Sequence, residues 1–202
     1  MKEIVIGVLW RIAFVLVLSA PVLSARQVEI IRYPPAPPQE NTLSMMLGRF
    51  GYFWASDPAF APIYGNGSVF GGELRLGGRI VTGWLEGSYR TRTGKFSFTG
   101  EETKVAVTAL EGGVIFRILP GPFMPYAGAG VGYYSYAETN EPIGRAKKYQ
   151  WGACAVAGAT LKIADRIALD YRIKYSTCRM RPADTKIEIG GLTLGLGLGL
   201  FF

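Results

Sequence analysis

Charged residues that recur at alternate positions within apolar stretches are the feature of this 202-residue sequence best suited to do chemistry. Four are acidic and six are basic: Arg49, Glu73, Arg75, Glu86, Arg90, Glu111, Arg117, Asp170, Arg172 and Lys174. If these groups share an enclosed space they must pair, because burying a lone charge costs several kcal/mol. The pattern favours a salt-bridged plug, and the alternative interpretation is an ion pathway or gate.

The sequence lacks the side chains that usually carry catalysis or bind a cofactor. The sequence has no histidine, which excludes Ser-His-Asp and Cys-His nucleophilic sites and histidine-based metal sites. The glycine pairs at 128 and 130 and at 195 and 197 lack the third glycine of a phosphate-binding loop. We therefore expect no catalytic residues, no metal and no cofactor, and a protein that is not an enzyme.

Alternation of apolar and polar residues with period two runs from residue 44 onward and is broken by turn signals. It predicts eight strands, at residues 44–55, 68–77, 80–92, 104–118, 125–137, 148–162, 166–178 and 187–202. The connections after the second, fourth and sixth strands are short, and the others are longer and polar. This layout is typical of an all-β, eight-stranded antiparallel up-and-down transmembrane β-barrel, here spanning residues 44–202.

Two features predict that the apolar faces point outward into lipid and the charges point into the lumen. In the last strand glycine alternates with leucine, and a water-facing row of glycines would weaken a soluble strand. Aromatic residues also gather at the long-loop ends of the apolar faces, as in an interfacial girdle. These residues are Tyr52, Trp54, Tyr89, Tyr133, Tyr149, Trp151 and Tyr175. The alternative is a soluble barrel with the two faces exchanged.

The lumen of so narrow a barrel has room only for side chains. By depth, five charged residues lie near its middle: Arg49, Glu73, Glu86, Glu111 and Arg172. We expect Arg49 or Arg172 to pair with Glu111, in space left by the glycines of the last strand. The register sets Cys154 and Cys178 too far apart for an unstrained disulfide, so two free thiols are predicted, with a disulfide as the alternative.

The N-terminal region precedes the barrel. Lys2 and Arg11 come before an apolar stretch that ends in small residues, as in a secretory signal peptide of residues 1–25. Cleavage is expected after Ala25, with Ala20 as a second candidate, and a retained membrane anchor is the alternative. Residues 26–43 are proline-rich and are expected to form an extended periplasmic spacer rather than a ligand for an SH3-like domain.

The segment from Pro125 to Tyr133, with sequence PYAGAGVGY, resembles the P-Y-x-G-x-G-x-G strand of small OmpA/OmpX/OmpW-like outer-membrane β-barrel domains. The last strand, with Leu198, Leu200 and Phe202 on one face, resembles the signal that such proteins present to the barrel-assembly machinery. The resemblance covers about residues 44–202. It implies an eight-stranded barrel in the bacterial outer membrane with periplasmic termini, but no single function.

The hypothesis that follows is a non-enzymatic outer-membrane protein with a structural or surface-interaction role and a largely closed lumen. The alternative is porin-like or transporter-like passage of small, mainly hydrophobic solutes. Expected partners are outer-membrane lipids, the barrel-assembly machinery and lipopolysaccharide, whose phosphates basic loop residues would meet. Those residues are Lys147, Lys148, Arg179 and Arg181. The formal charge of +7 is spread thinly along the chain, so nucleic acid is not an expected partner. The protein is expected to be a monomer.

Overall fold

The computed structural model describes residues 44–57, 61, 66–95, 102–119, 121–140, 144–181 and 187–202. The predicted signal peptide, 1–25, and spacer, 26–43, lie outside the described residues. No helix among the described residues is long and apolar enough to cross a membrane.

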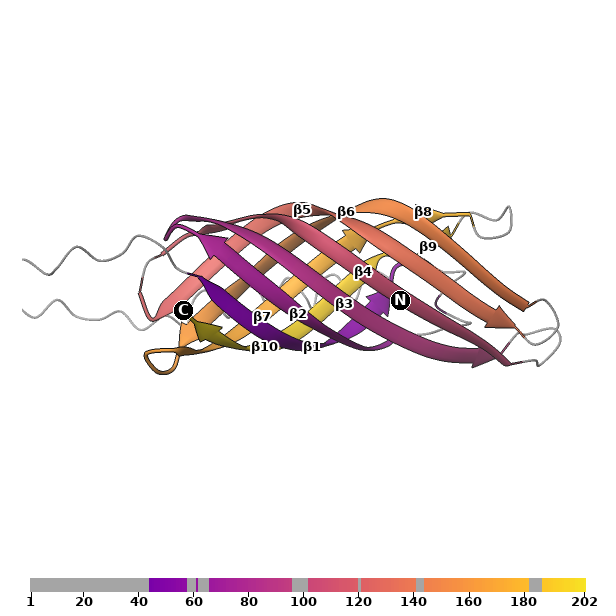
Figure 1. The fold of residues 1–202 in the computed structure, drawn as a ribbon, viewed down its shortest axis with the longest axis horizontal. Helices are drawn as coiled ribbons and strands as arrows, with labels where there is room; N and C mark the ends of the chain where they lie inside the picture. The colour runs from indigo at the N-terminus through magenta and orange to yellow at the C-terminus, as the bar shows by residue number, and fades with distance from the viewer. Residues whose placement is uncertain are drawn as a thin grey trace, which may run out of the picture. The chain divides into compact units, whose positions relative to one another are not determined.

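Eight strands form a closed antiparallel barrel (Figure 1). They are β1 (Met45–Ala55), β2 (Gly67–Gly77), β3 (Val81–Lys95), β4 (Glu102–Arg117), β5 (Phe123–Asn140), β6 (Gly144–Lys162), β7 (Ile167–Thr177) and β10 (Gly191–Phe201). Each strand pairs with the next along the chain, and β10 closes the ring between β7 and β1. The predicted fold class and up-and-down order are confirmed.

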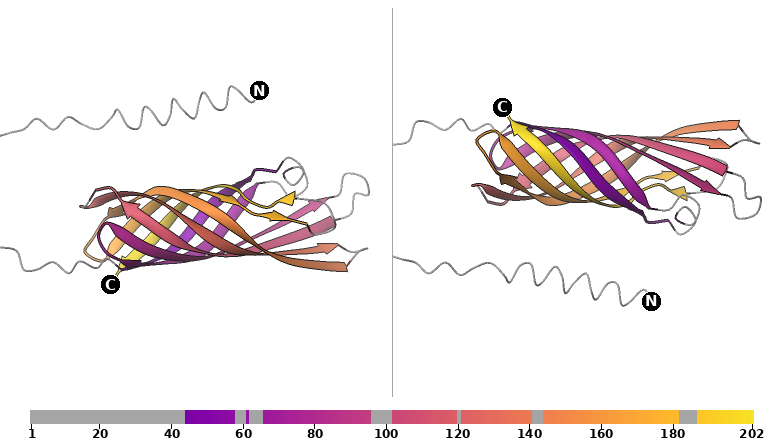
Figure 2. Two further views of the ribbon diagram at one scale, coloured as in Figure 1. Left: turned by 90° about the horizontal axis from the view of Figure 1, so that it is seen from above. Right: turned by 90° about the horizontal axis from the view of Figure 1, so that it is seen from below.

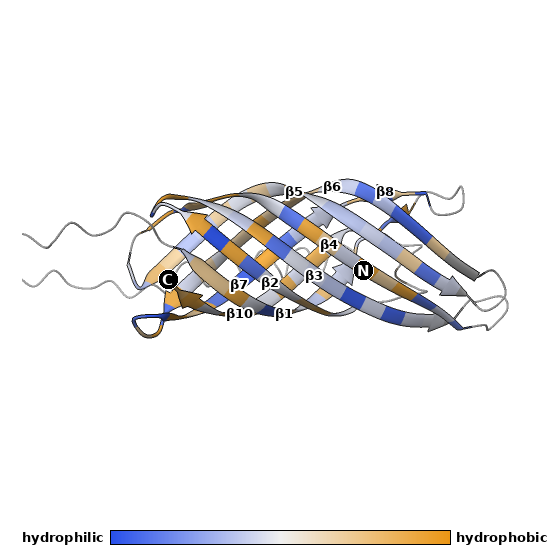
Figure 3. Cartoon of the chain, viewed as in Figure 1, coloured by the Kyte–Doolittle hydropathy of each residue, from blue (hydrophilic) through white to orange (hydrophobic). Residues whose placement is uncertain are grey.

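The alternation of side chains decides which face is inside. In β7 every second residue is buried and its neighbours are exposed, so Asp170 and Arg172 lie in the lumen while Tyr171 lies outside. In β10, Leu196 and Leu198 are 54% and 63% exposed. Figure 3 shows the same alternation as hydrophobic and hydrophilic bands along the strands. The apolar-out orientation of a membrane barrel is confirmed, because a soluble barrel would bury these leucines.

Strands β3 to β6 are longer than predicted at the long-loop end. β6 begins at Gly144 rather than near residue 148, and β5 continues to Asn140. In Figures 1 and 2 these strands project past the ends of β1, β7 and β10. The polar sequence there has the composition of a loop, but β5 and β6 continue to pair as far as Asn140 and Gly144.

The last predicted strand, 187–202, is wrong as one continuous element. Residues Ile187–Glu188 form β9, which pairs with β8 (Arg179–Met180) in a separate two-stranded sheet, and barrel strand β10 begins only at Gly191. Between them Gly190 passes close to β7, where an added Cβ would lie 2.2 Å from the Ser176 carbonyl oxygen. Only a residue without a side chain fits so close to the neighbouring backbone.

Apolar side chains fill the lumen on both sides of its charged middle. At the short-turn end Met45, Leu47 and Ala168 are fully buried, with Phe201 packed against them. At the long-loop end lies a larger cluster, which we call the upper apolar cluster. Its members are Val105, Val107, Ala109, Tyr134, Tyr136, Cys178, Met180 and Ile189. Toward the long-loop end the lumen is therefore apolar, and Ile189, just before β10, is fully buried there.

Candidate functional site

The centre of the lumen holds a continuous set of ion pairs, which we call the central network. Its members are Arg49, Glu73, Arg75, Glu86, Glu111, Asp170, Arg172 and Lys174. They come from β1, β2, β3, β4 and β7, and each is at most 8% exposed. Four cations face four carboxylates, so the network carries no net charge.

Asp170 is the most heavily bonded carboxylate of the network. Its Oδ1 accepts hydrogen bonds from Arg49 Nη2 at 2.9 Å and from the Tyr126 hydroxyl at 2.8 Å. Its Oδ2 accepts one from the Thr160 hydroxyl at 2.6 Å and lies 3.1 Å from Arg75 Nη1. Four donors around one buried carboxylate offset much of the cost of removing it from water.

Glu73 joins three arginines. Its Oε2 lies 2.6 Å from Arg49 Nε and 2.5 Å from Arg172 Nη1, and its Oε1 accepts a short hydrogen bond from Arg75 Nε. Because Arg49 and Arg75 also contact Asp170, these two arginines and two carboxylates form a compact cluster.

Arg172 and Lys174 extend the network toward the long-loop end. Arg172 Nη2 donates a short hydrogen bond to Glu86, whose other oxygen lies 2.9 Å from Lys174 Nζ. Lys174 also pairs closely with Glu111, which accepts a 2.5 Å hydrogen bond from the Tyr134 hydroxyl. The predicted pairing of Glu111 with Arg49 or Arg172 is wrong, because Lys174 occupies that place.

Two predicted members stay outside the network, at its two ends. Arg90 lies 3.6 Å above the Phe53 ring and donates a hydrogen bond to the Ile189 carbonyl. Arg117, toward the short turns, donates to the Gly78 carbonyl oxygen at 2.9 Å. Neither arginine pairs with a carboxylate among the described residues, so both lie outside the balanced set.

Sequence reasoning missed three polar residues that complete the network: Tyr126, Tyr134 and Thr160. Tyr126 and Tyr134 lie on the same face of β5 as the glycines of the PYAGAGVGY segment. Their period-two spacing from these glycines could have placed both tyrosines in the lumen. Thr160 likewise lies on the buried face of β6 and bridges Arg75 and Asp170. These hydroxyls hold the carboxylates without adding charge.

The glycines of β5 make room for side chains that cross the lumen. A Cβ at Gly132 would lie 2.8 Å from Glu111 Cγ, and one at Gly130 would lie 3.0 Å from the Trp84 ring. In β10, Gly197 similarly lies against Arg49, with 3.3 Å from its Cβ position to Nη1. The predicted role of the last strand's glycines is therefore confirmed for Arg49. For Arg172, the structure gives no such contact.

Both cysteines are free and buried. Cys154 lies on the lumen face of β6, as predicted. Cys178 lies beyond the end of β7, in the upper apolar cluster, rather than on a predicted strand 166–178. Burial and the nearby Glu188 carboxylate raise the pKa of the Cys178 thiol to about 12.

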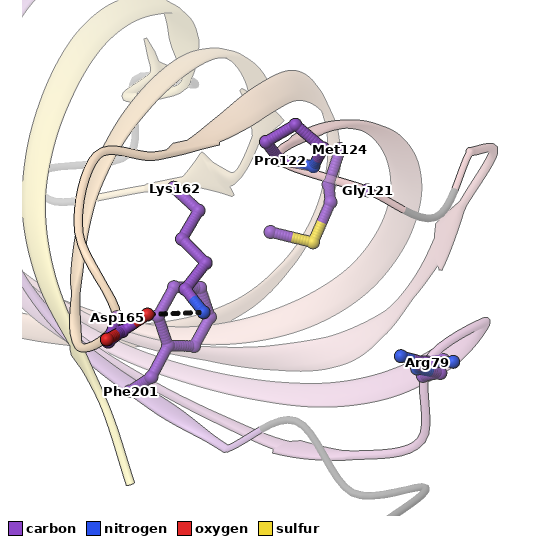
Figure 4. A pocket seen from close by; sticks show the side chains of 7 residues that line it. All are labelled: Arg79, Gly121, Pro122, Met124, Lys162, Asp165 and Phe201. Carbon is purple, nitrogen blue, oxygen red and sulfur yellow. Dashed lines mark ion pairs between the residues drawn. The ribbon is translucent and has the colours of Figure 1, made fainter. Parts of the chain in front are cut away.

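Two cavities in the middle and at the long-loop end of the lumen are small. They lie beside the network and the upper apolar cluster and have volumes of about 20 and 10 Å³. A larger pocket of about 410 Å³ opens at the short-turn end, where Lys162 and Asp165 form an ion pair across 3.8 Å (Figure 4). Met124 and Phe201 give that pocket an apolar side (Figure 4).

The residues predicted as an assembly signal lie on the outer surface of the barrel. Leu198, Leu200 and Phe202 are 63%, 52% and 74% exposed. The Phe202 amide donates to the Ser44 carbonyl oxygen at 3.1 Å, so the end of the chain is fixed beside the start of β1.

No family model matches the chain, and no curated protein matches it. Solved structures do. Neisserial surface protein A is 15% identical, with a TM-score of 0.60, over 81% of this chain and 100% of that one. OprG, an outer membrane protein from Pseudomonas aeruginosa, is 12% identical, with a TM-score of 0.59, over 79% and 95%. Ail, the attachment invasion locus protein of Yersinia pestis, in complex with the heparin analogue sucrose octasulfate, is 16% identical, with a TM-score of 0.54, over 81% and 99%.

The likeness establishes the fold, which is that of a small outer-membrane β-barrel. The predicted resemblance to this class is confirmed. The fold and the exposed apolar outer surface together agree with the predicted outer-membrane location.

Proposed function

We propose that the protein is a non-enzymatic outer-membrane barrel with a closed lumen, which acts by supporting the envelope and by presenting its long loops at the cell surface. The observation that carries the proposal is the central network, in which four cations and four carboxylates fill the middle of the lumen. The lack of histidine supports the non-enzymatic part.

The sizes of the lumen cavities support closure. A cavity needs roughly 10–15 Å³ to hold a single water molecule. The cavity beside the network measures about 20 Å³ and the one beside the upper apolar cluster about 10 Å³. A solute would have to break several buried ion pairs to pass. Opening such a path would leave charges unpaired in a low-dielectric space, at about 3–5 kcal/mol for each broken pair.

Conductance of the purified full-length barrel in a planar bilayer tests closure. We expect almost no steady current from the wild type. A Glu73→Ala/Arg172→Ala variant removes one carboxylate and one cation, and with them four ion pairs of the central network. It should conduct measurably more, which also shows that the assay detects an open lumen. Steady wild-type channels equal to those of the variant would refute the proposal.

Exposed positive charge at the long-loop end supports an interaction with anionic partners at the cell surface. Exposed basic residues lie at the long-loop end, among them Lys104, Lys147, Arg179 and Arg181. Ail, a similar barrel, was crystallised with a sulfated heparin analogue. We propose lipopolysaccharide phosphates and other outer-membrane lipids as the anionic partners, and a monomer that reaches the membrane through the barrel-assembly machinery.

A second candidate function is the passage of small, mainly hydrophobic solutes. The upper apolar cluster favours it, since Val105, Val107 and Ile189 would line the entrance of such a path. Uptake of an apolar dye into liposomes that hold the barrel distinguishes the two functions. Faster uptake than into liposomes without protein would favour passage.

A further inference from the structure

The wall formed by β4, β5 and β6 presents one face to the surroundings beyond the closed ring of the barrel. β7 stops pairing with β6 at Ala153, whereas β5 and β6 pair on to Asn140 and Gly144. Figures 1 and 2 show β3 to β6 standing past the end of β7. The outward face of the wall continues upward from the surface that contacts lipid.

A column of three aromatic rings and one cation runs up this outward face. Trp151 lies opposite Tyr133, with ring centroids 5.2 Å apart. The Tyr133 ring stacks on Tyr149 at 5.7 Å with an interplanar angle of 7°. The Lys147 ammonium lies 5.1 Å from the centre of the Tyr149 ring. All three rings are partly exposed, Trp151 the most at 66%, so each offers a free surface to a ligand.

A second lysine faces the same way across β5. Lys104 of β4 pairs with Thr139, and Lys147 of β6 pairs with Ala137, so the two lysines flank β5 on its outward face, one same-face step apart. Between them lie the small side chains of Ala106, Ala137 and Thr139. The result is a shallow platform with an exposed cation on each side.

The outward face changes character in a fixed order. Val131, one same-face step before Tyr133, and Leu110, which pairs with Tyr133, are 59% and 56% exposed and suit acyl chains. Aromatic rings follow, which favour the membrane interface, and then ammonium groups, which bind phosphate. Acyl chains, sugar rings and phosphates occur in the same order in a phosphorylated glycolipid.

We propose that Tyr133, Tyr149 and Trp151, with Lys104 and Lys147, form a binding site for the phosphorylated amino-sugar headgroup of an outer-leaflet glycolipid such as the lipid A part of lipopolysaccharide. The inference rests on the proposed lipopolysaccharide contact and makes it specific. It adds Lys104 to the basic residues expected from the sequence and selects Lys147 over its neighbour Lys148. Lys148 pairs with the buried Tyr136 and therefore belongs to the opposite face of β6.

Binding of diphosphoryl lipid A to the full chain in detergent, followed by native mass spectrometry, tests the site. Lys147→Gln and Lys104→Gln should each weaken binding roughly tenfold, since each removes one charge-assisted phosphate contact. Lys148→Gln is the matched control, with the same change one residue away, and should bind within about twofold of the wild type. Heat-modifiable gel migration checks that every variant is folded.

Two further arms identify the ligand chemistry. Monophosphoryl lipid A should bind more weakly than the diphosphoryl form, and phosphatidylglycerol should not displace it. Unchanged binding by Lys147→Gln, equal loss in Lys148→Gln, or displacement by phosphatidylglycerol would overturn the site. A conducting wild-type lumen would refute the closed-barrel function and leave these binding results unaffected.

Discussion

Glu111→Gln should destabilise the folded barrel by leaving Lys174 with one carboxylate in place of two. Glutamine keeps the shape of the side chain, and its amide oxygen can still accept the hydrogen bond from the Tyr134 hydroxyl. The change therefore isolates the charge. Losing one partner of a buried pair costs about 3–5 kcal/mol. Since Lys174 keeps Glu86 at 2.9 Å, we expect the lower part of that range or slightly less, about 2–3 kcal/mol.

Lys174→Met should cost more than Glu111→Gln. It leaves Glu111 without a cation among the described residues and leaves Glu86 with Arg172 alone. The double variant Glu111→Gln/Lys174→Met restores equal numbers of positive and negative charges in the network. It should be much less destabilised than the two single changes would give together, with a coupling energy above about 1 kcal/mol.

Urea unfolding of the barrel in lipid vesicles, monitored by tryptophan fluorescence, measures all four free energies. The control cycle combines Glu111→Gln with Lys162→Met, which removes an exposed pair with Asp165 at the short-turn end. The effects of these two changes on the free energy of unfolding should add to within about 0.5 kcal/mol. If the Glu111 and Lys174 changes also added within that margin, the ion pairs would not act as a unit and the argument for a neutral plug would fail.

Three other perturbations test the outer face, the end of the chain and the upper apolar cluster. Leu196→Arg should destabilise the barrel by about 2–4 kcal/mol because it puts a cation against lipid. Gly195→Ser, on the lumen side, should cost less. The yield of barrel refolded into vesicles measures both, and a lower yield for Gly195→Ser than for Leu196→Arg would show that the lipid and lumen faces are assigned the wrong way round. Deleting Phe202 should lower the amount of folded barrel in the outer membrane, measured by heat-modifiable migration of membrane extracts, and an unchanged amount would remove its assembly role. Because burial raises the pKa of Cys178 to about 12, its alkylation in the folded barrel should keep accelerating about tenfold per pH unit from pH 8 to 11; a plateau near pH 9 would show an ordinary thiol.

The alternation of residue types was enough to predict the faces of the strands and the fold class. The side-chain period of a strand is two, so a single strand such as β7 already separates Asp170 and Arg172 from Tyr171 and Ile173. Turn lengths then set the strand order. Neither inference needs long-range information, which explains why both agree with the structure.

The pairing of charges across the lumen could not be predicted in the same way. Lys174 and Glu111 come from β7 and β4, which are three strands apart in the ring. Which side chains meet there depends on strand tilt and stagger, and these are properties of the closed barrel rather than of one strand. The division of residues 187–202 into β9 and β10 likewise depends on contacts with Ser176 and Cys178, which alternation does not record.

The distribution of charge along the lumen supports closure independently of the individual pairs. The cost of burial falls on unbalanced charge, so a closed barrel should neutralise its middle and place any excess toward its ends. Arg90 and Arg117, the two cations beyond the balanced set, do lie on the two sides of the network, each bonded to a backbone carbonyl. A conducting lumen would instead favour unpaired charges of one sign at its narrowest part, to attract a counter-ion. In the narrow middle Asp170 has four donors, which fill its acceptor sites, and Glu73 contacts three arginines, so both carboxylates are already neutralised by the barrel's own cations. The proposed closure would confine exchange with the outside to the surface of the barrel, where the rings of β5 and β6 and their flanking lysines are exposed.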